Sequence, residues 1–572
     1  MRVHYILPVL VLVLVFGAGC KRGANQWGDL EGESTDLSEG AEADVQDTDV
    51  SLSFLLPNGD EVGVDSHRIS RHSRIKVGAE SDPSQCKLMW KDVEVPMNEV
   101  AMGNIAQSEN EIILKADKPL HNGEYTLCGV TFKTKAPGDL NADGISDMVI
   151  GGSRAFGDKG AAFIFFGKDN PEWESYEDAD VTIQSSLQHG RFGKVLAVGD
   201  LNGDGIDDIA IGAPDDEATQ RKRGAVYIFY GRESWNPDYV SVSANSVIRR
   251  INGDESKFGN ALAMGDINGD GFDDLIVGER DAHNLDNAGG INAGTGAAHL
   301  FLGSKDGLAP QRLVTDSEQG DMSFYAMTAS LTVDAVGAGV ASGDVNEDGI
   351  DDVIIGAPMV SPQNQPGRVY VMLGGRDVAN KGASLSLENV SKVEQKITIM
   401  GTEDLGVSVA AYTLSPEKDG ILLGSKGLAF SYEYEEGNPL GLVDQLGLGP
   451  VPQFFHEVLV GWLGVGIGIG APVESLFFFS DYPPQDWQVR PQGQSVPMTS
   501  MGCSMSSIGD INADGKPDFA YGECEGISNV TPGVMGGVVY VNINGVDMPI
   551  TGTRNPGQRE QFGSAIAGGR IR

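Results

Sequence analysis

Aspartate, asparagine and glycine recur in one nine-residue pattern at five places in this 572-residue chain. The copies read DLNADGISD, DLNGDGIDD, DINGDGFDD, DVNEDGIDD and DINADGKPD, and they begin at Asp139, Asp200, Asp266, Asp344 and Asp510. Side-chain oxygens stand at positions 1, 3, 5 and 9 of each copy, and a glycine at position 6 permits a sharp turn. Such a loop can wrap a hard cation that takes about six to eight oxygen ligands, so the pattern predicts calcium.

Each copy is expected to supply four side-chain ligands and the backbone carbonyl of position 7. The predicted ligands are Asp139, Asn141, Asp143, Ile145 and Asp147; Asp200, Asn202, Asp204, Ile206 and Asp208; Asp266, Asn268, Asp270, Phe272 and Asp274; Asp344, Asn346, Asp348, Ile350 and Asp352; and Asp510, Asn512, Asp514, Lys516 and Asp518. The alternative is a solvated acidic turn, because these residue types favour turns in any case. Five copies in register favour the metal, and about five Ca²⁺ ions are expected.

The segments around the loops predict strands. An EF-hand would place helices on both sides and a glutamate at position 12, whereas position 12 is apolar here, as at Ile211, Val277 and Ile355. Short apolar segments such as RFGKVLAVGD precede the loops, and segments such as GAVYIFYG follow a GAP turn. The repeating unit is therefore a strand, an acidic loop, a second strand, a turn, a third strand and a variable fourth strand.

This unit resembles the FG-GAP repeat of integrin α-subunit β-propellers, from about Gly138 to the C-terminus. Two degenerate copies can be placed between Asp344 and Asp510, one starting at Asp404 and one ending in GIGIGAP at Gly466. The resemblance implies an all-β fold whose main part is a seven-bladed propeller with calcium loops.

The two ends of the chain predict closure of the propeller. The first copy has no FG strand before Gly138, and the chain finishes with EQFGSAIAGG from Glu560, an FG strand that no loop follows. Joined together, the two parts make one complete repeat. Such a join removes an open sheet edge, which would invite aggregation.

The N-terminus resembles a bacterial lipoprotein signal peptide over residues 1–20. Basic residues precede an apolar run from Tyr5 to Phe16, and small residues lead to Cys20, the predicted lipidation site. The run is too short to span a bilayer. We expect a lipid-anchored protein of the bacterial cell envelope, held at the outer membrane on either its periplasmic or its exposed side, with plain secretion or an uncleaved anchor as alternatives. The lipid anchor is the only membrane contact expected.

Two further regions precede the propeller, which is expected over residues 138–572. Residues 21–49 are acidic and poor in large apolar residues, so they predict a disordered tether. Residues 50–137 contain alternating strand patterns that predict a small β-sandwich, and the stretch NGEYTLCGV is similar to late strands of bacterial immunoglobulin-like domains. An oxidising compartment favours disulfides. Pairing within each region would join Cys86 to Cys128 and Cys503 to Cys524, although three pairings are possible.

The net charge of −40 argues against nucleic acid as a partner. The sequence contains no HExxH motif, and GCSMS at Gly502 lacks the second glycine of a nucleophile elbow. The sequence therefore favours a non-enzymatic recognition or adhesion protein whose ligand is an extracellular or envelope protein or glycan. A propeller enzyme acting on envelope or matrix glycans and a structural envelope scaffold remain the alternatives. Long segments at Glu279 to Gly296 and Thr315 to Ala335 predict binding on the face opposite the calcium loops.

Overall fold

The fold is all-β in the part of the chain that the computed structural model describes. Short helical segments are limited there to α2 (Ala155–Asp158) and two 3-10 turns, Tyr176–Asp178 and Ser241–Ser243. The described residues are 50–57, 59–66, 69, 73–79, 87–90, 93–95, 97–99, 111–116, 123–134, 137–216, 223–251, 256–282, 284–285, 291–292, 295–315, 320–325, 335–358, 367–375, 378, 385–386, 396–400, 408–415, 418–425, 428–432, 501–514, 518–523, 537–543, 546–552 and 561–569.

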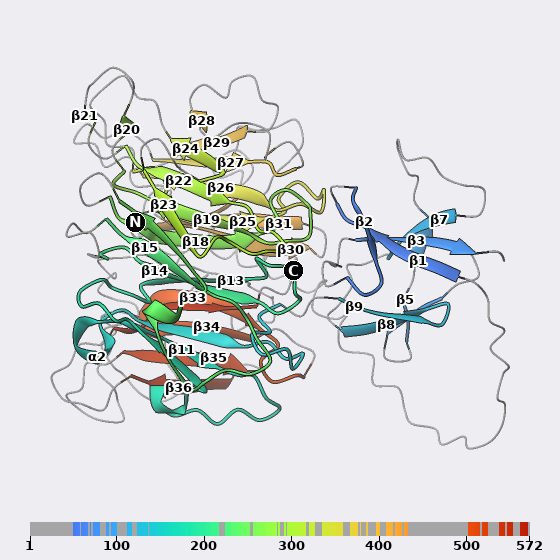
Figure 1. The fold of residues 1–572 in the computed structure, drawn as a ribbon, viewed down its shortest axis with the longest axis horizontal. Helices are drawn as coiled ribbons and strands as arrows, with labels where there is room; N and C mark the ends of the chain where they lie inside the picture. Colours follow the sequence, from blue (N-terminus) through green and yellow to red (C-terminus); the bar gives the residue numbers. More distant parts are fainter. Residues whose placement is uncertain are drawn as a thin grey trace, which may run out of the picture.

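The N-terminal strands form two antiparallel sheets that share one core. The first sheet has the order β2 (Glu61–Gly63), β1 (Val50–Leu55), β3 (Arg74–Ala79), β7 (Glu111–Ala116), β6 (Met97–Glu99), and the second has the order β5 (Val93–Val95), β4 (Leu88–Trp90), β8 (Gly123–Leu127), β9 (Val130–Thr134). Phe54 of the first sheet packs against Phe132 of the second, with ring centroids 4.6 Å apart. The two sheets therefore form the predicted β-sandwich, which Figure 1 shows in blue beside the larger body.

The larger body consists of antiparallel sheets that we call blades. In spatial order, the first blade contains β37 (Phe562–Gly568), β10 (Met148–Gly152), β11 (Ala161–Phe165) and β12 (Val181–Gln184), and the second contains β13 (Val195–Gly199), β14 (Asp208–Ala213), β15 (Ala225–Phe229) and β17 (Ser246–Arg250). The third blade contains β18 (Phe258–Gly265), β19 (Asp274–Glu279), β22 (Ala297–Phe301) and β24 (Met322–Tyr325), and the fourth contains β25 (Val340–Gly343), β26 (Asp352–Ala357), β27 (Arg368–Met372) and β29 (Lys396–Met400). The fifth blade contains β30 (Ser408–Ser415), β31 (Lys418–Ser425) and β32 (Leu428–Tyr432), and the last contains β33 (Met501–Gly509), β34 (Asp518–Glu523), β35 (Val538–Ile543) and β36 (Val546–Thr551).

Neighbouring blades pack through their first strands. Contacts run from β33 to β37, from β37 to β13, and on through β18 and β25 to β30. Successive small antiparallel sheets, most of them with four such strands, are joined in this way in a β-propeller. The degenerate copy that ends in GIGIGAP, a segment starting at Gly466, lies outside the described residues, as do the leader and the acidic tether.

The C-terminal strand completes the first blade. β37 pairs antiparallel with β10, in a register that sets Met148 opposite Gly568 and Ile150 opposite Ile566. The prediction that the C-terminal strand completes the first blade is thus confirmed. Figure 1 shows the red strands of the last blade beside β11 of the first blade, far from them in sequence.

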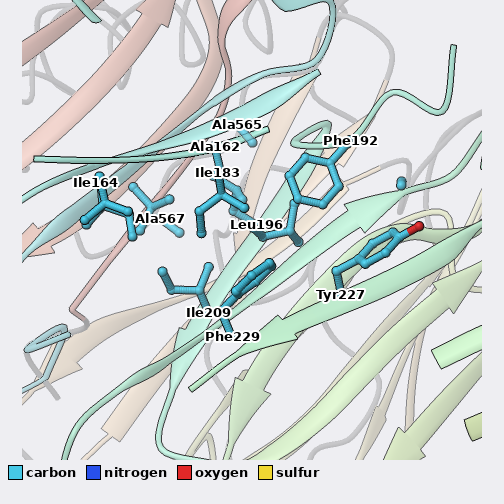
Figure 2. Packing of buried hydrophobic residues seen from close by; sticks show 14 of the residues in the cluster. Ala162, Ile164, Ile183, Phe192, Leu196, Ile209, Tyr227, Phe229, Ala565 and Ala567 are labelled. Atoms are coloured by element: carbon cyan, nitrogen blue, oxygen red, sulfur yellow. The ribbon is translucent and has the colours of Figure 1, made fainter. Parts of the chain in front are cut away.

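Apolar cores lie between blades. One cluster joins Ile164 and Ile183 of the first blade, Ile209 and Phe229 of the second, and Ala567 of the C-terminal strand. Figure 2 shows these side chains pointing toward one another between the two sheets. Neighbouring blades therefore stabilise one another, as in other repeat folds.

A fifth, parallel strand at the outer edge of several blades was not predicted. The connection between the third and fourth strands of one blade adds this strand to the blade before it: β16 (Asp238–Val240) pairs with β12, β23 (Gln311–Val314) with β17, and β28 (Leu385–Ser386) with β24. These additions cover strand edges that would otherwise be exposed.

The insertion after β19 contains a small hairpin of its own. β20 (Asn284–Leu285) pairs with β21 (Ile291–Asn292), and Figure 1 shows both strands at the margin of the propeller. Within the described part of the chain, no helix is long and apolar enough to cross a membrane.

Candidate metal centre

Each acidic loop connects the first and second strands of its blade. Asp200, Asp266, Asp344 and Asp510 directly follow first strands, and the aspartate at position 9 begins the second strand in the same four blades. The loop that starts at Asp139 follows Gly138, which packs against Gly569 at the end of β37. We call these the first, second, third, fourth and last loops, according to their blades.

Hydrogen bonds inside the second loop show how the sequence folds it. The Asp200 carboxylate accepts bonds from the N–H groups of Gly203 at 2.6 Å, Asp204 at 3.2 Å and Gly205 at 3.0 Å. Gly205 has φ +85°, a left-handed conformation that glycine adopts without strain. The Asp204 carboxylate accepts a bond from Ile206 N–H at 2.9 Å. The other loops repeat most of these bonds, so the carboxylates at positions 1 and 5 hold the backbone of each loop in a tight curl.

The aspartate at position 9 is the most buried predicted ligand. Asp208 has no exposed surface, and its two oxygens accept bonds from Leu201 N–H and Gly231 N–H, both at 2.9 Å. Burial raises the pKa of Asp208 well above its ordinary value, and the charges of Asp200 and Asp204 raise it further. The predicted carboxylate ligands of this loop are therefore close enough to repel one another.

The same electrostatics recur in the other loops. Burial is the first cause of a raised pKa at Asp147, Asp274 and Asp352, and the aspartates at positions 1 and 5 add to it. Asp518 follows the same pattern with a pKa raised to about 7. A cation among these carboxylates would remove the repulsion.

Among the described residues, no group of three or more His, Cys, Asp or Glu side chains is arranged closely enough to hold a metal ion. Asp204 Oδ2 accepts a bond from Asn202 Nδ2 at 2.9 Å, and equivalent pairs occur in other loops. The donor set, with three carboxylates, an amide and a carbonyl, has the chemistry that calcium prefers. Lys516 at position 7 of the last loop lies outside the described residues.

Position 8 of the pattern was missed as a functional position. Asp273 donates from its N–H to the Asp200 carbonyl at 2.8 Å, and its carboxylate accepts a bond from the Asp200 N–H, also at 2.8 Å. Asp273 of the third loop therefore fixes the position of Asp200, the first residue of the second loop, through two hydrogen bonds. The signal in the sequence was the recurring aspartate pair at positions 8 and 9, present in three of the five copies.

Only part of the predicted cysteine chemistry falls within the described residues. Cys128 is disulfide-bonded, whereas Cys20, Cys86 and Cys524 lie outside the described residues. Cys503 lies in β33. The pairing of the four cysteines stays a prediction.

A buried cluster in the third blade contains the residue types of an acid–base relay. His299 lies 2.8 Å from Ser323 Oγ through Nδ1 and 2.8 Å from Glu279 Oε2 through Nε2. Arg250 Nε lies 3.2 Å from Glu279 Oε1. Ser323 has no exposed surface, so it cannot meet a substrate in this conformation. The cluster instead fixes the end of β19, from which the insertion begins.

Three blades of the propeller match the FG-GAP repeat. A family model for the FG-GAP repeat matches residues 192–229, 258–301 and 336–372, which fall in the second, third and fourth blades. In these repeats the chain is integrin α-like. It is 31% identical over 284 residues to integrin alpha pat-2 of Caenorhabditis briggsae, covering 46% of this chain and 20% of that protein. It is 33% identical over 196 residues to integrin alpha-5 of Xenopus laevis, covering 31% and 18%.

The chain is also similar in sequence to an enzyme. The chain is 31% identical over 153 residues to phosphatidylinositol-glycan-specific phospholipase D of Homo sapiens, covering 24% of this chain and 17% of that protein. The chain thus spans about a fifth or less of the length of these curated relatives. Among solved structures, a Dos1 propeller overlaps 83% of this chain and 80% of its own with 10% identity and a TM-score of 0.28, an overlap that supports no inference.

Proposed function

We propose that this protein is a calcium-stabilised recognition or adhesion scaffold that binds a protein or glycan outside the cytoplasm. The observation that carries the proposal is a propeller of integrin α-like FG-GAP repeats. A rigid propeller presents long loops on its faces, and binding residues are commonly placed on such loops. The ligand is proposed to contact the face opposite the acidic loops.

Calcium is proposed as the resident cation of the five acidic loops. The supporting observations are the hard oxygen donors at five equivalent places and the mutual repulsion of the carboxylates at positions 1, 5 and 9. The ion would neutralise this repulsion and fix the connection between the first two strands of each blade. Calcium is a structural partner in this account, and it takes no part in chemistry.

A seven-bladed propeller over residues 138–572, preceded by an immunoglobulin-like domain over residues 50–137, is the proposed domain organisation. The seventh blade would come from the degenerate copy near Gly466. Disulfides Cys86–Cys128 and Cys503–Cys524 are proposed within these two domains. The engagement of Cys128 in a disulfide supports the first of them.

Lipid attachment at Cys20 is proposed to hold the protein in the bacterial envelope, through the tether of residues 21–49. A Cys20→Ser variant is expected to move from the membrane fraction to the soluble fraction, because the acceptor thiol is lost. Cell fractionation with immunoblotting measures the change. A variant that stays with the membrane would show that another segment anchors the chain.

The insertion after β19 is the proposed ligand-contacting element, and replacing it tests the function. Exchanging residues 281–292 for a short Gly-Ser loop keeps Glu279 and its buried partners His299 and Arg250, so the third blade should stay folded. We expect calcium-dependent melting to be unchanged and binding to an extract of envelope and matrix to fall at least about tenfold, as for loss of a central contact. Equal retention of the same bound species by both proteins would place the site elsewhere.

An enzymatic role is the second candidate, and the similarity to a phospholipase D is the observation that favours it. That similarity covers 17% of the relative. The described relay of Glu279, His299 and Ser323 is buried. We therefore propose a non-enzymatic function. Release of product from phosphatidylinositol-glycan or matrix glycan substrates by the purified chain would overturn this proposal.

A further inference from the structure

The five acidic loops lie in consecutive blades and are joined to one another by hydrogen bonds. We propose that they bind calcium as one coupled set, so that occupation of one loop favours occupation of its neighbours. This inference rests on the proposed calcium binding and concerns how the sites depend on one another.

The first link passes from a predicted ligand of one loop to a predicted ligand of the next. Asp208 Oδ1 accepts a bond from Gly231 N–H at 2.9 Å. The next residue, Arg232, donates its N–H to the Leu140 carbonyl at 3.1 Å. The Leu140 N–H donates to Asp147 Oδ2 at 2.8 Å. The ligand carboxylates at position 9 of the second and first loops are thus connected through backbone groups alone.

The same link recurs between the other neighbouring loops. Ser304 N–H donates to the Leu201 carbonyl at 3.0 Å, Gly375 N–H to Ile267 at 2.8 Å, and Lys168 N–H to Ile511 at 2.9 Å. In each case the preceding glycine is held by the position 9 aspartate of its own blade. A continuous path therefore runs through five carboxylates, in the order Asp352, Asp274, Asp208, Asp147 and Asp518.

The second link is the clamp formed by position 8. Asp207 acts on the first loop as Asp273 acts on the second. Its N–H donates to the Asp139 carbonyl at 2.8 Å, and its carboxylate accepts a bond from the Gly138 N–H. Asp351 donates to the Asp266 carbonyl at 3.0 Å. Ser146 takes this place at the ring closure, where its hydroxyl accepts a bond from Asp510 N–H at 3.2 Å.

These links give coupling a physical route. A cation fixes the carboxylates at positions 1 and 9, and each of these positions is bonded to backbone that shapes a neighbouring loop. Ordering one loop therefore lowers the conformational entropy that the next loop must lose on binding. Asp207, Asp273 and Asp351 are positioning residues in this account, because they hold the neighbouring loop.

Glycine is required where the blades meet. A Cβ atom on Gly303 would lie 2.2 Å from the Asp273 carbonyl oxygen and 2.8 Å from the Leu201 carbonyl oxygen. Both neighbours are backbone atoms and cannot turn away. Gly303→Ala should therefore separate the second and third loops although it alters no predicted ligand. Gly190→Ala is the matched control, because its Cβ would meet nothing nearer than 3.6 Å.

The test follows each loop separately in the full-length protein. Hydrogen exchange of peptides that cover the five loops, measured through a calcium titration, gives one midpoint for each loop. In Asp204→Ala, which removes a ligand of the second loop, we expect the midpoints of the first and third loops to rise about fivefold or more. The wild-type titration should also be steeper than that of independent sites. Gly303→Ala should raise the midpoints of the second and third loops, whereas Gly190→Ala should not.

The outcomes separate the two claims. Protection that does not respond to calcium in the wild type would refute calcium binding, and the coupling with it. A wild-type response with unchanged first and third midpoints in Asp204→Ala would leave calcium binding in place and overturn the coupling. If Asp204→Ala does not fold, the steepness of the wild-type titration and the Gly303→Ala midpoints decide the question, with non-cooperative curves and unshifted midpoints counting against coupling.

Discussion

Removing calcium with a chelator is expected to lower the midpoint of thermal unfolding by several degrees. Saturating one site at ten times its dissociation constant adds about 1.4 kcal/mol, so five sites add about 7 kcal/mol. Each kcal/mol corresponds to about 1 °C in a domain of several hundred residues. Scanning calorimetry in about 10 mM calcium and in chelator measures the shift, because extracellular modules bind at roughly 0.1–1 mM. Magnesium at equal ionic strength is the control, and identical melting in all three solutions would rule out structural calcium.

The pH dependence of the stability of the calcium-free protein is a second test of the repulsion among the loop carboxylates. The pKa of Asp518 is raised to about 7 by burial and by the neighbouring aspartates. The folded state therefore holds a proton that the unfolded state releases near pH 4, and stability is lost as pH rises from about 4 through 7. Bound calcium should abolish this decline. A calcium-free protein whose melting temperature rises over the same interval would contradict the electrostatic account.

Phe562→Ala is expected to cost about 3–5 kcal/mol of unfolding free energy, the range for removing a large aromatic side chain from a core. Phe562 is 1% exposed on the strand that closes the propeller, and its ring centroid lies 5.5 Å from that of Phe163. Loss of the ring weakens both the first and last blades, because it packs between them.

Val546→Ala is the matched control for the closure. Val546 is 69% exposed on β36, so its truncation should change the unfolding free energy by less than about 0.5 kcal/mol. Denaturant unfolding followed by tryptophan fluorescence measures both variants. Equal costs for Phe562→Ala and Val546→Ala would mean that the C-terminal strand does not close the propeller.

Local patterns made much of the fold predictable. The alternation of loop and apolar segment placed the first three strands of most blades, since turn residues and short β-branched runs act within a few residues of each other. The split repeat at the two chain ends predicted the pairing of β37 with β10, because only one partner could complete each half.

Features that depend on contacts between blades were not predictable in this way. Asp273 and Asp200 are separated by 73 positions in sequence, and only the packed ring brings them together. The parallel edge strands have the same origin: Asp238–Val240 is too short to be distinguished from a loop until β12 of the preceding blade is beside it. The buried pair of Glu279 and His299 likewise arises from neighbouring strands of the third blade.

The number of calcium ions that the full-length protein binds tests the central claim most directly. Equilibrium dialysis of chelator-treated protein, combined with calorimetric titration, gives both the number and the affinities. Five acidic loops predict about five ions with dissociation constants of roughly 0.1–1 mM. A protein that binds no calcium at about 10 mM, with magnesium and calcium indistinguishable, would contradict the account.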